Sequence, residues 1–130
     1  METNDSPAIL RDLSAAAHVT LAVNDFGSQL LRQVVAGQSG NIIISPLSVW
    51  SLLAMVRNGA VGETRSAIDR TIGVATMPEG EINARWAAMA RVIGAQRGSC
   101  KVEIANAAWL NAIGAINPEF VRLIREFHQA

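Results

Sequence analysis

The segment 47–56 constrains the fold of this chain more than any other, because it is apolar at every position except Ser48 and Ser51. The residues before it favour a helix. Ser45 can accept a hydrogen bond from the free N–H groups of a first turn, and Pro46 suits the first helical position. A helix that is apolar nearly all round belongs inside a protein rather than on its surface. The sequence therefore predicts a central, buried helix.

Three further helices are predicted from apolar residues at helical spacing. The first covers 9–36, and Gly37 follows it as a C-terminal cap. Gly27 inside this helix lowers its stability by about 1 kcal/mol relative to Ala, so a close packing contact is expected there. Another covers 64–72. The third follows Pro78, with a buried stripe made of Ile82, Trp86, Met89 and Ile93.

Turn and cap residues set the expected helix boundaries. Asn58 and Gly59 are predicted to end the central helix in the left-handed conformation, and Gly62 with Thr64 is expected to start the next helix. Near the C-terminal end, Asn117 is predicted to cap a fifth helix that opens at Pro118. The buried face expected for this last helix consists of Phe120, Leu123, Ile124 and Phe127.

Two strands are predicted between the helices. Three consecutive β-branched residues at 42–44 suit a short buried strand. Segment 101–111 is apolar on both alternating faces over most of its length, which is typical of a central strand in a covered sheet. The predicted fold class is therefore α+β, with about five helices, one short strand and one longer sheet strand. Because a central strand needs partners on both edges, the sheet is expected to be incomplete and the chain to be the beginning of a larger domain.

Composition argues against several classes of function. Half of the residues are apolar, 17% are charged and the formal net charge is zero, so we expect a globular chain without affinity for nucleic acid or for an anionic membrane. Cys100 is the only cysteine and cannot form an internal disulfide. The N-terminal residues lack the basic and apolar regions of a secretory signal, so a cytoplasmic location is expected and an extracellular one stays open.

Catalytic and metal-binding patterns are also missing from the sequence. Segment 37–40 lacks the spacing of a nucleophile elbow, and the glycine-containing segment 59–64 has no Lys to hold a phosphate. His18, His128 and Cys100 are too far apart in the sequence to suggest a zinc site. We therefore expect no enzymatic activity, no cofactor and no metal.

Two motifs, in the right order and at about the right spacing, resemble the serpin family. The stretch NIIISPLSVWSLLAMVRNGAVGETRSAI resembles the strand–helix–helix segment near the start of serpins. VEIANAAWLN followed by INPEFVRLIREFHQA is similar to the family's next signature, an Ala-Asn strand and an Asn-Pro-x-Phe helix. Upstream, AVNDFGSQLLRQV is similar to the first helix of the family. The resemblance covers the chain from about residue 21 onward.

The resemblance implies a large α+β domain whose central sheet can accept the protein's own reactive loop. Inhibitory serpins are cleaved by a target protease, insert that loop and trap the protease as a distorted acyl-enzyme. Residues 1–130 would be the N-terminal part of a single serpin domain, roughly its first third, without the reactive loop and the C-terminal strands. Suicide-substrate inhibition is then expected only if the chain continues into a full serpin domain.

The alternative is a non-inhibitory, truncated serpin fragment that acts, if at all, through protein–protein association. A protease is the expected partner only if a longer chain supplies the reactive loop. Otherwise the exposed edges of the predicted strand favour self-association or pairing with a complementary serpin segment.

The resemblance also implies a polar network that helps hold the family's sheet closed until the loop inserts. Ser45 and Ser48 match serines at the front of the central helix, and Asn106 matches the Asn of a neighbouring strand. A buried network of this kind sets a conformational preference only when every member is paired. The family's network includes a His from a later strand, and neither His18 nor His128 lies in a matching segment. The simpler alternative is a helix cap at Ser45 and, for Ser48 and Asn106, a polar residue that bonds back to its own helix or lies at the edge of the strand.

Overall fold

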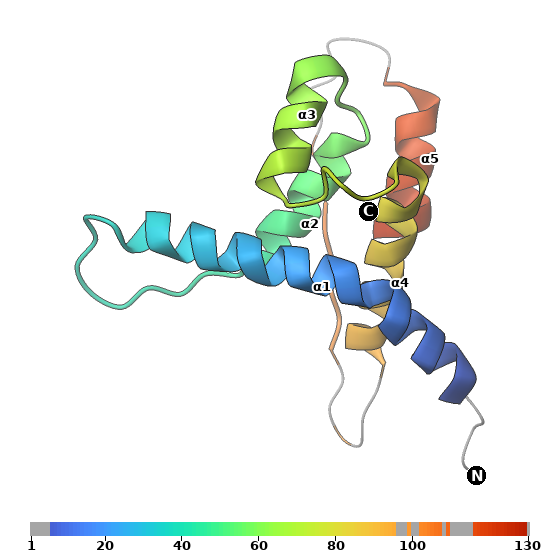
Figure 1. Ribbon diagram of the computed structural model, residues 1–130, viewed down its shortest axis with the longest axis horizontal. Coiled ribbons are helices and arrows are strands. Elements are labelled where there is room, and N and C mark those ends of the chain that lie inside the picture. The colour runs from blue at the N-terminus through green and yellow to red at the C-terminus, as the bar shows by residue number, and fades with distance from the viewer. Residues whose placement is uncertain (1–5, 96–98, 100–101, 108, 110–115, 130) are drawn as a thin grey trace.

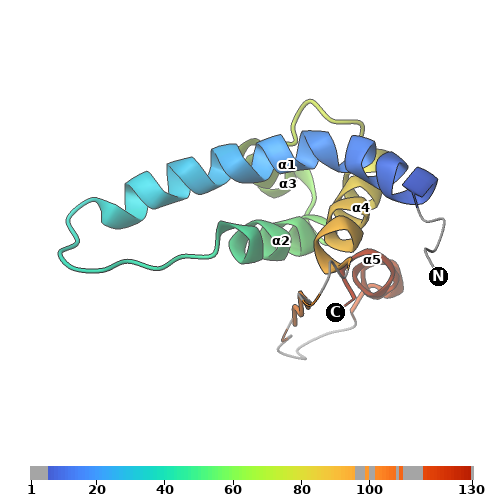
Figure 2. The same cartoon turned by 90° about the horizontal axis from the view of Figure 1, so that it is seen from below.

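The computed structural model describes residues 6–95, 99, 102–107, 109 and 116–129. These residues form α1 (Ser6–Val35), α2 (Pro46–Arg57), α3 (Gly62–Thr71), the 3-10 turn η1 (Glu79–Glu81), α4 (Ile82–Gly94) and α5 (Pro118–His128). The long helix α1 crosses α2 and α4, and α5 lies beside α4 (Figure 1). The view from below shows α2, α4 and α5 gathered on one side of α1 (Figure 2).

One face of α1 builds the core together with the helices beneath it. Val19 and Phe26 from α1 meet Trp50 from α2 and Trp86 from α4, and the two indole rings lie 5.5 Å apart between centroids. The predicted stripe of α4 is confirmed, since Ile82, Trp86 and Met89 are buried and Ile93 is partly buried. The remaining buried members of this cluster are Ala16, Val23, Ala54, Ile72, Val74, Ile82 and Met89.

Polar contacts fix how the helices are placed against one another. Arg91 of α4 donates hydrogen bonds of 2.9 and 2.8 Å to the two carboxylate oxygens of Asp12 on α1. These hydrogen bonds hold the pKa of the Asp12 carboxyl below its ordinary value.

Toward the C-terminal end of α1, Gly27 lies against Pro46, whose Cβ would be 2.9 Å from a side-chain carbon added to the glycine. The close contact expected at Gly27 is therefore confirmed.

The two predicted strands are wrong for the part of the chain that the structure describes. Segment 42–44 is extended but has no strand partner, and the side chain of Ile43 is 98% exposed. Segment 102–107 also has no strand partner, and Trp109 is 94% exposed. A strand exists only where its backbone N–H and C=O groups pair with a neighbouring strand, and the described residues supply none. Positions 101, 108, 110 and 111 of the predicted strand lie outside the described residues.

The prediction that the central helix is buried on all sides is also wrong within the described ranges. Trp50, Ala54 and Met55 are buried, whereas Val49, Leu52 and Val56 are exposed. The sequence correctly marks every face of α2 as apolar. Burial, however, depends on neighbouring elements, and those described here cover only part of the helix surface.

The helix boundaries differ from the predictions mainly around α3. This helix begins at Gly62 rather than at Thr64, and Val61 occupies the N-cap position without a side-chain hydrogen bond. The predicted left-handed stop after α2 is wrong, because Asn58 has φ −64° and ψ −23° and Gly59 lies outside the left-handed region. Gly59 has a different reason to be small: an added side-chain carbon would lie 3.2 Å from the ring of Phe120. After α1, Gly37 does take the left-handed conformation predicted for it, with φ 79°.

Candidate functional site: a polar network along α2

The front of α2 places two of the predicted site residues in direct contact. The Ser45 Oγ accepts a hydrogen bond of 3.4 Å from the backbone N–H of Ser48, and Pro46 follows as the first helical residue. The Oγ atoms of Ser45 and Ser48 lie 2.8 Å apart, so one hydroxyl donates to the other. Both serines are exposed in the described part of the chain. Ser45 therefore satisfies a free amide of the first turn, as an N-cap residue does.

Among the described residues, the side chain of Asn106, the third predicted site residue, makes no hydrogen bond to either of these serines. Its Oδ1 lies 3.2 Å from the Oγ of Ser51, which is wholly buried one turn further along α2. The same Oγ lies 3.0 Å from the backbone oxygen of Ser48. A serine hydroxyl has one hydrogen and two lone pairs. If the Asn106 amide is turned so that its NH₂ group faces Ser51, both contacts are complete hydrogen bonds.

The network therefore has two parts that meet on α2. Ser45 and Ser48 form a solvent-facing pair at the helix start, and Ser51 links the helix to segment 102–107 through Asn106. Sequence reasoning missed Ser51 as a site residue. The signal was present, because Ser51 is one of only two polar residues in 47–56 and lies three positions after Ser48, on the same side of a helix.

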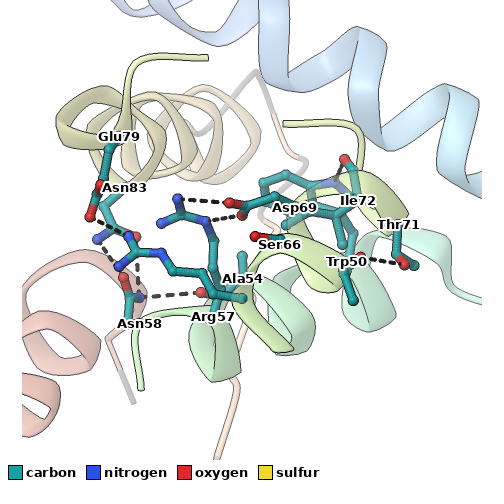
Figure 3. Close-up of polar contacts among 12 residues, drawn as sticks. Trp50, Ala54, Arg57, Asn58, Ser66, Asp69, Thr71, Ile72, Glu79 and Asn83 are labelled. Carbon is teal, nitrogen blue, oxygen red and sulfur yellow. Dashed lines mark hydrogen bonds and ion pairs between the residues drawn. The ribbon is translucent and has the colours of Figure 1, made fainter. Parts of the chain in front are cut away.

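A second polar cluster joins the ends of α2, α4 and α5. Asn58 and Asn83 exchange side-chain amide hydrogen bonds of 3.2 and 2.9 Å, and the Nε2 of His128 lies 3.4 Å from each of them. The imidazole ring of His128 stacks on the indole of Trp86, with centroids 5.9 Å apart and an interplanar angle of 19°. Figure 3 shows Asn58 facing Asn83.

His128 is nearly enclosed by this cluster. It is 5% exposed, its Nδ1 has no hydrogen-bond partner within the described residues, and burial lowers its pKa to about 4. The expected buried face of α5 did not include it, although Ile124 is buried and Phe120, Leu123 and Phe127 are partly buried as predicted. His128 follows Ile124 by one helical turn, so helical spacing could have placed it on that face.

The remaining cap and turn residues have local roles. Asn117 accepts a 2.9 Å hydrogen bond from the backbone N–H of Glu119, and Pro118 is the first residue of α5. Gly62 takes a φ of 57° at the start of α3, and Thr64 lies within the first turn of that helix. None of these residues joins the two polar clusters in the contacts of the described chain.

A buried ion pair lies between α2 and α3. The guanidinium of Arg57, whose side chain is 4% exposed, pairs with the carboxylate of Asp69 (Figure 3). The pair joins α2 to α3 and so helps to hold α3 in position.

The described residues hold neither a metal site nor a membrane-spanning helix. No group of three or more His, Cys, Asp or Glu side chains in these ranges is arranged to hold a metal ion. No helix in the same ranges combines the length and the apolar character needed to cross a membrane.

Comparison with known proteins gives one consistent result. The family model described as "Serpin (serine protease inhibitor)" matches residues 21–130. The chain is 32% identical over 109 residues to rabbit (Oryctolagus cuniculus) corticosteroid-binding globulin, covering 82% of this chain and 28% of that protein. It is 24% identical over 110 residues to human neuroserpin, covering 84% and 27% respectively.

A serine protease inhibitor of the jellyfish Cyanea capillata is 30% identical over 115 residues, covering 88% of this chain and 29% of the relative. The chain thus spans less than a third of the length of these curated relatives. No solved structure matches it.

Proposed function

Because the chain belongs to the serpin family, we propose that residues 1–130 form the N-terminal part of a single serpin domain and act only as part of that domain. Serpins are inhibitors rather than enzymes, and the jellyfish relative carries the name serine protease inhibitor. In this proposal a protease is the partner of a longer chain that also contains a reactive loop. The 130 residues alone would not inhibit a protease.

The observation that carries this proposal is the exposed apolar surface of α2. Val49, Leu52 and Val56 form an uncovered side of a helix whose other side is packed against the core. Beside it, the segment containing Asn106 is extended and has no strand partner among the described residues. An apolar helix face next to an unpaired extended segment is the arrangement expected where a sheet would lie in a larger domain.

The polar network would then stabilise the contact between α2 and the extended segment. Ser45, Ser48 and Asn106 are its family-inferred members, and Ser51 supplies the contact with Asn106. The contact between Ser51 and Asn106 joins a buried hydroxyl on the helix to the extended segment 102–107. In the longer chain this contact would favour one position of the segment over others.

The first experiment tests whether protease inhibition requires a chain longer than these 130 residues. The 130-residue chain and the product of any longer reading frame from the same gene are each incubated with a panel of serine proteases. Complexes that survive denaturing gel electrophoresis are then sought. We expect a complex only for the longer chain, because trapping a protease requires the reactive loop. A denaturant-stable complex of the 130-residue chain would overturn the proposal.

The second experiment tests the network by a double-mutant cycle. Ser51→Ala, Asn106→Ala and the double variant are compared by urea unfolding, and hydrogen exchange of 102–107 is followed by mass spectrometry. We expect a coupling of about 1 kcal/mol between the two residues and faster exchange in both single variants. Ser66→Ala is the matched control, because this exposed hydroxyl bonds only to Gly62 O within its own helix. Additive effects of the two single changes would contradict the network.

The alternative function, association of a non-inhibitory fragment with other proteins, is supported by the same exposed face of α2. It predicts that the purified 130-residue chain captures a complementary serpin segment. To test this alternative, the 130-residue chain is sedimented alone and mixed with a separate peptide that carries the residues following position 130 in a longer reading frame. A chain that gains no mass in the presence of the peptide argues against this alternative.

A further inference from the structure

The long helix α1 carries a second apolar stripe on the side turned away from the core. Leu10 and Leu21 are 65% and 70% exposed, and Leu13, Leu31 and Val35 are exposed as well. Val19 and Phe26, which belong to the core cluster, lie on the other side of α1 by helical spacing. The stripe is therefore uncovered in the part of the chain that the structure describes.

The spacing of the stripe is that of a helix-pairing seam. Eight positions follow one another at intervals of three or four residues and fall on one side of the helix. None of the eight carries a charge. They are Leu10, Leu13, Ala17, Leu21, Asn24, Ser28, Leu31 and Val35.

We propose that this stripe is an interface with a second copy of this chain, in which the two α1 helices pair antiparallel. Six of the eight stripe positions exchange with one another when the stripe is reversed about a two-fold axis between residues 22 and 23. Leu10 then faces Val35 of the second copy, and Leu13 and the second copy's Leu31 lie one position apart along the pair. The small side chains of Ala17 and Ser28 face each other. Large apolar residues thus close both ends of the pair, and small ones allow close approach nearer the middle.

The polar positions of the stripe are compatible with this arrangement. The Ser28 hydroxyl donates to Asn24 O at 3.0 Å within its own helix, so it brings no unpaired donor to the interface. Asn24 faces Leu21 of the second copy. The two Asn24 residues then lie three positions apart along the pair, about 4.5 Å in axial rise, so their amides can bond to each other. A polar pair of this kind sets the register of paired helices.

Antiparallel rather than parallel pairing follows from the helix dipoles. Two 30-residue helices side by side repel when their dipoles point the same way and attract when they are opposed. The stripe extends over about 38 Å. Burying it on both copies would remove on the order of 1,000 Å² of protein surface from solvent, which is near the lower limit for a specific interface. The structure therefore fits an association of modest strength.

This interface uses no residue of the polar network along α2, which the proposed serpin function invokes. Leu10 and Leu13 precede residue 21, where the match to the family model begins. Leu21, Leu31 and Val35 lie on a helix that contributes no residue to the network along α2.

Disulfide crosslinking tests the register directly. In a Cys100→Ser background, the double variant Ala17→Cys/Ser28→Cys places a cysteine of one copy opposite a cysteine of the other. Within one helix the two sites are about 16 Å apart, too far to bridge. In the antiparallel pair, two copies of Ala17→Cys alone are also about 16 Å apart. We expect a covalent dimer from the double variant under mild oxidation and none from Ala17→Cys alone.

Each other outcome would contradict the proposal. A covalent dimer of Ala17→Cys alone would indicate parallel pairing. The absence of a crosslink in the double variant, with folded protein by circular dichroism, would mean that the stripe does not pair in this register.

Sedimentation equilibrium tests whether the stripe drives association in the unmodified chain. Leu21→Glu places a charge in the centre of the seam and is expected to weaken association on the order of 100-fold. Val61→Glu is the control: it introduces a charge at an exposed apolar residue outside both the α1 stripe and the exposed face of α2, and it should leave association unchanged. A monomeric wild-type chain, or association lost through Val61→Glu but not through Leu21→Glu, would overturn the proposal.

Discussion

The indole Nε1 of Trp50 donates a buried 2.8 Å hydrogen bond to the backbone oxygen of Ile72. The two residues are 22 positions apart and belong to α2 and to the end of α3 (Figure 3). Ile72 is the C-cap residue of α3, where a helix leaves backbone oxygens without partners of its own. The tryptophan thus fills the core and completes the end of a neighbouring helix.

Trp50→Phe is expected to lower the free energy of unfolding by about 2–4 kcal/mol, since it removes core volume and leaves a buried carbonyl unpaired. Urea unfolding followed by far-ultraviolet circular dichroism measures this without relying on tryptophan fluorescence. Trp109→Phe is the control, because Trp109 is almost fully exposed and the change there should stay within about 0.5 kcal/mol. Equal effects at the two sites would contradict the role given to Trp50.

Because His128 is buried, we expect the free energy of unfolding to depend on pH. Its pKa is lowered to about 4 by burial, against about 6.5 for an exposed histidine, so the unfolded chain binds the proton more readily. The stabilising effect of the neutral ring is complete above pH 6.5 and is lost as the pH falls toward 4. The loss over that interval should be about 3 kcal/mol.

The measurement is the free energy of unfolding at several pH values for the wild type, His128→Gln and His18→Gln. His128→Gln should be less stable at neutral pH and should lack the extra loss between pH 6.5 and 4. His18 is exposed, and His18→Gln is the control for replacing a histidine outside the buried cluster. If His128→Gln kept the same slope as the wild type, another group would be responsible.

Breaking the ion pair between Arg57 and Asp69 should lower the free energy of unfolding, mainly because one buried charge is left without its partner. Asp69→Asn leaves a buried guanidinium without its counter-ion, and a loss of about 3–5 kcal/mol is expected in chemical unfolding. Glu79→Gln breaks the more exposed pair with Arg65 and should change stability by less than about 0.5 kcal/mol. A comparable loss in both variants would show that burial of Arg57 is not the cause.

Gly27→Ala tests the close contact between α1 and the start of α2. The added carbon would lie 2.9 Å from Pro46 Cβ, and the rigid ring cannot turn away from it. We expect a net loss of about 1–2 kcal/mol, because the strain exceeds the gain of about 1 kcal/mol in helix propensity. Gly80→Ala meets nothing within 4 Å and should be nearly neutral. A stabilised Gly27→Ala variant would contradict the contact.

Much of the candidate site followed from residue type and spacing. The serine-proline step before α2 predicted Ser45 as the cap and Pro46 as the first helical residue, because both requirements are local. Ser51 and His128 were missed as members of polar clusters. Their roles depend on Asn106 and on Asn58 with Asn83, which lie far away in the sequence, and nothing in the local pattern names those partners.

The sequence by itself determined where the helices lie, which residues of α4 are buried and to which family the chain belongs. Helical spacing, helix caps and family motifs each depend on residues that are close together in the sequence. Whether an apolar segment becomes a strand or a covered helix was decided by the tertiary structure. Segment 42–44 and the exposed side of α2 have the composition of a protein interior, yet they are uncovered in the described chain. The physical reason is that strand pairing and burial each require a neighbouring surface, which a segment's own residues cannot supply.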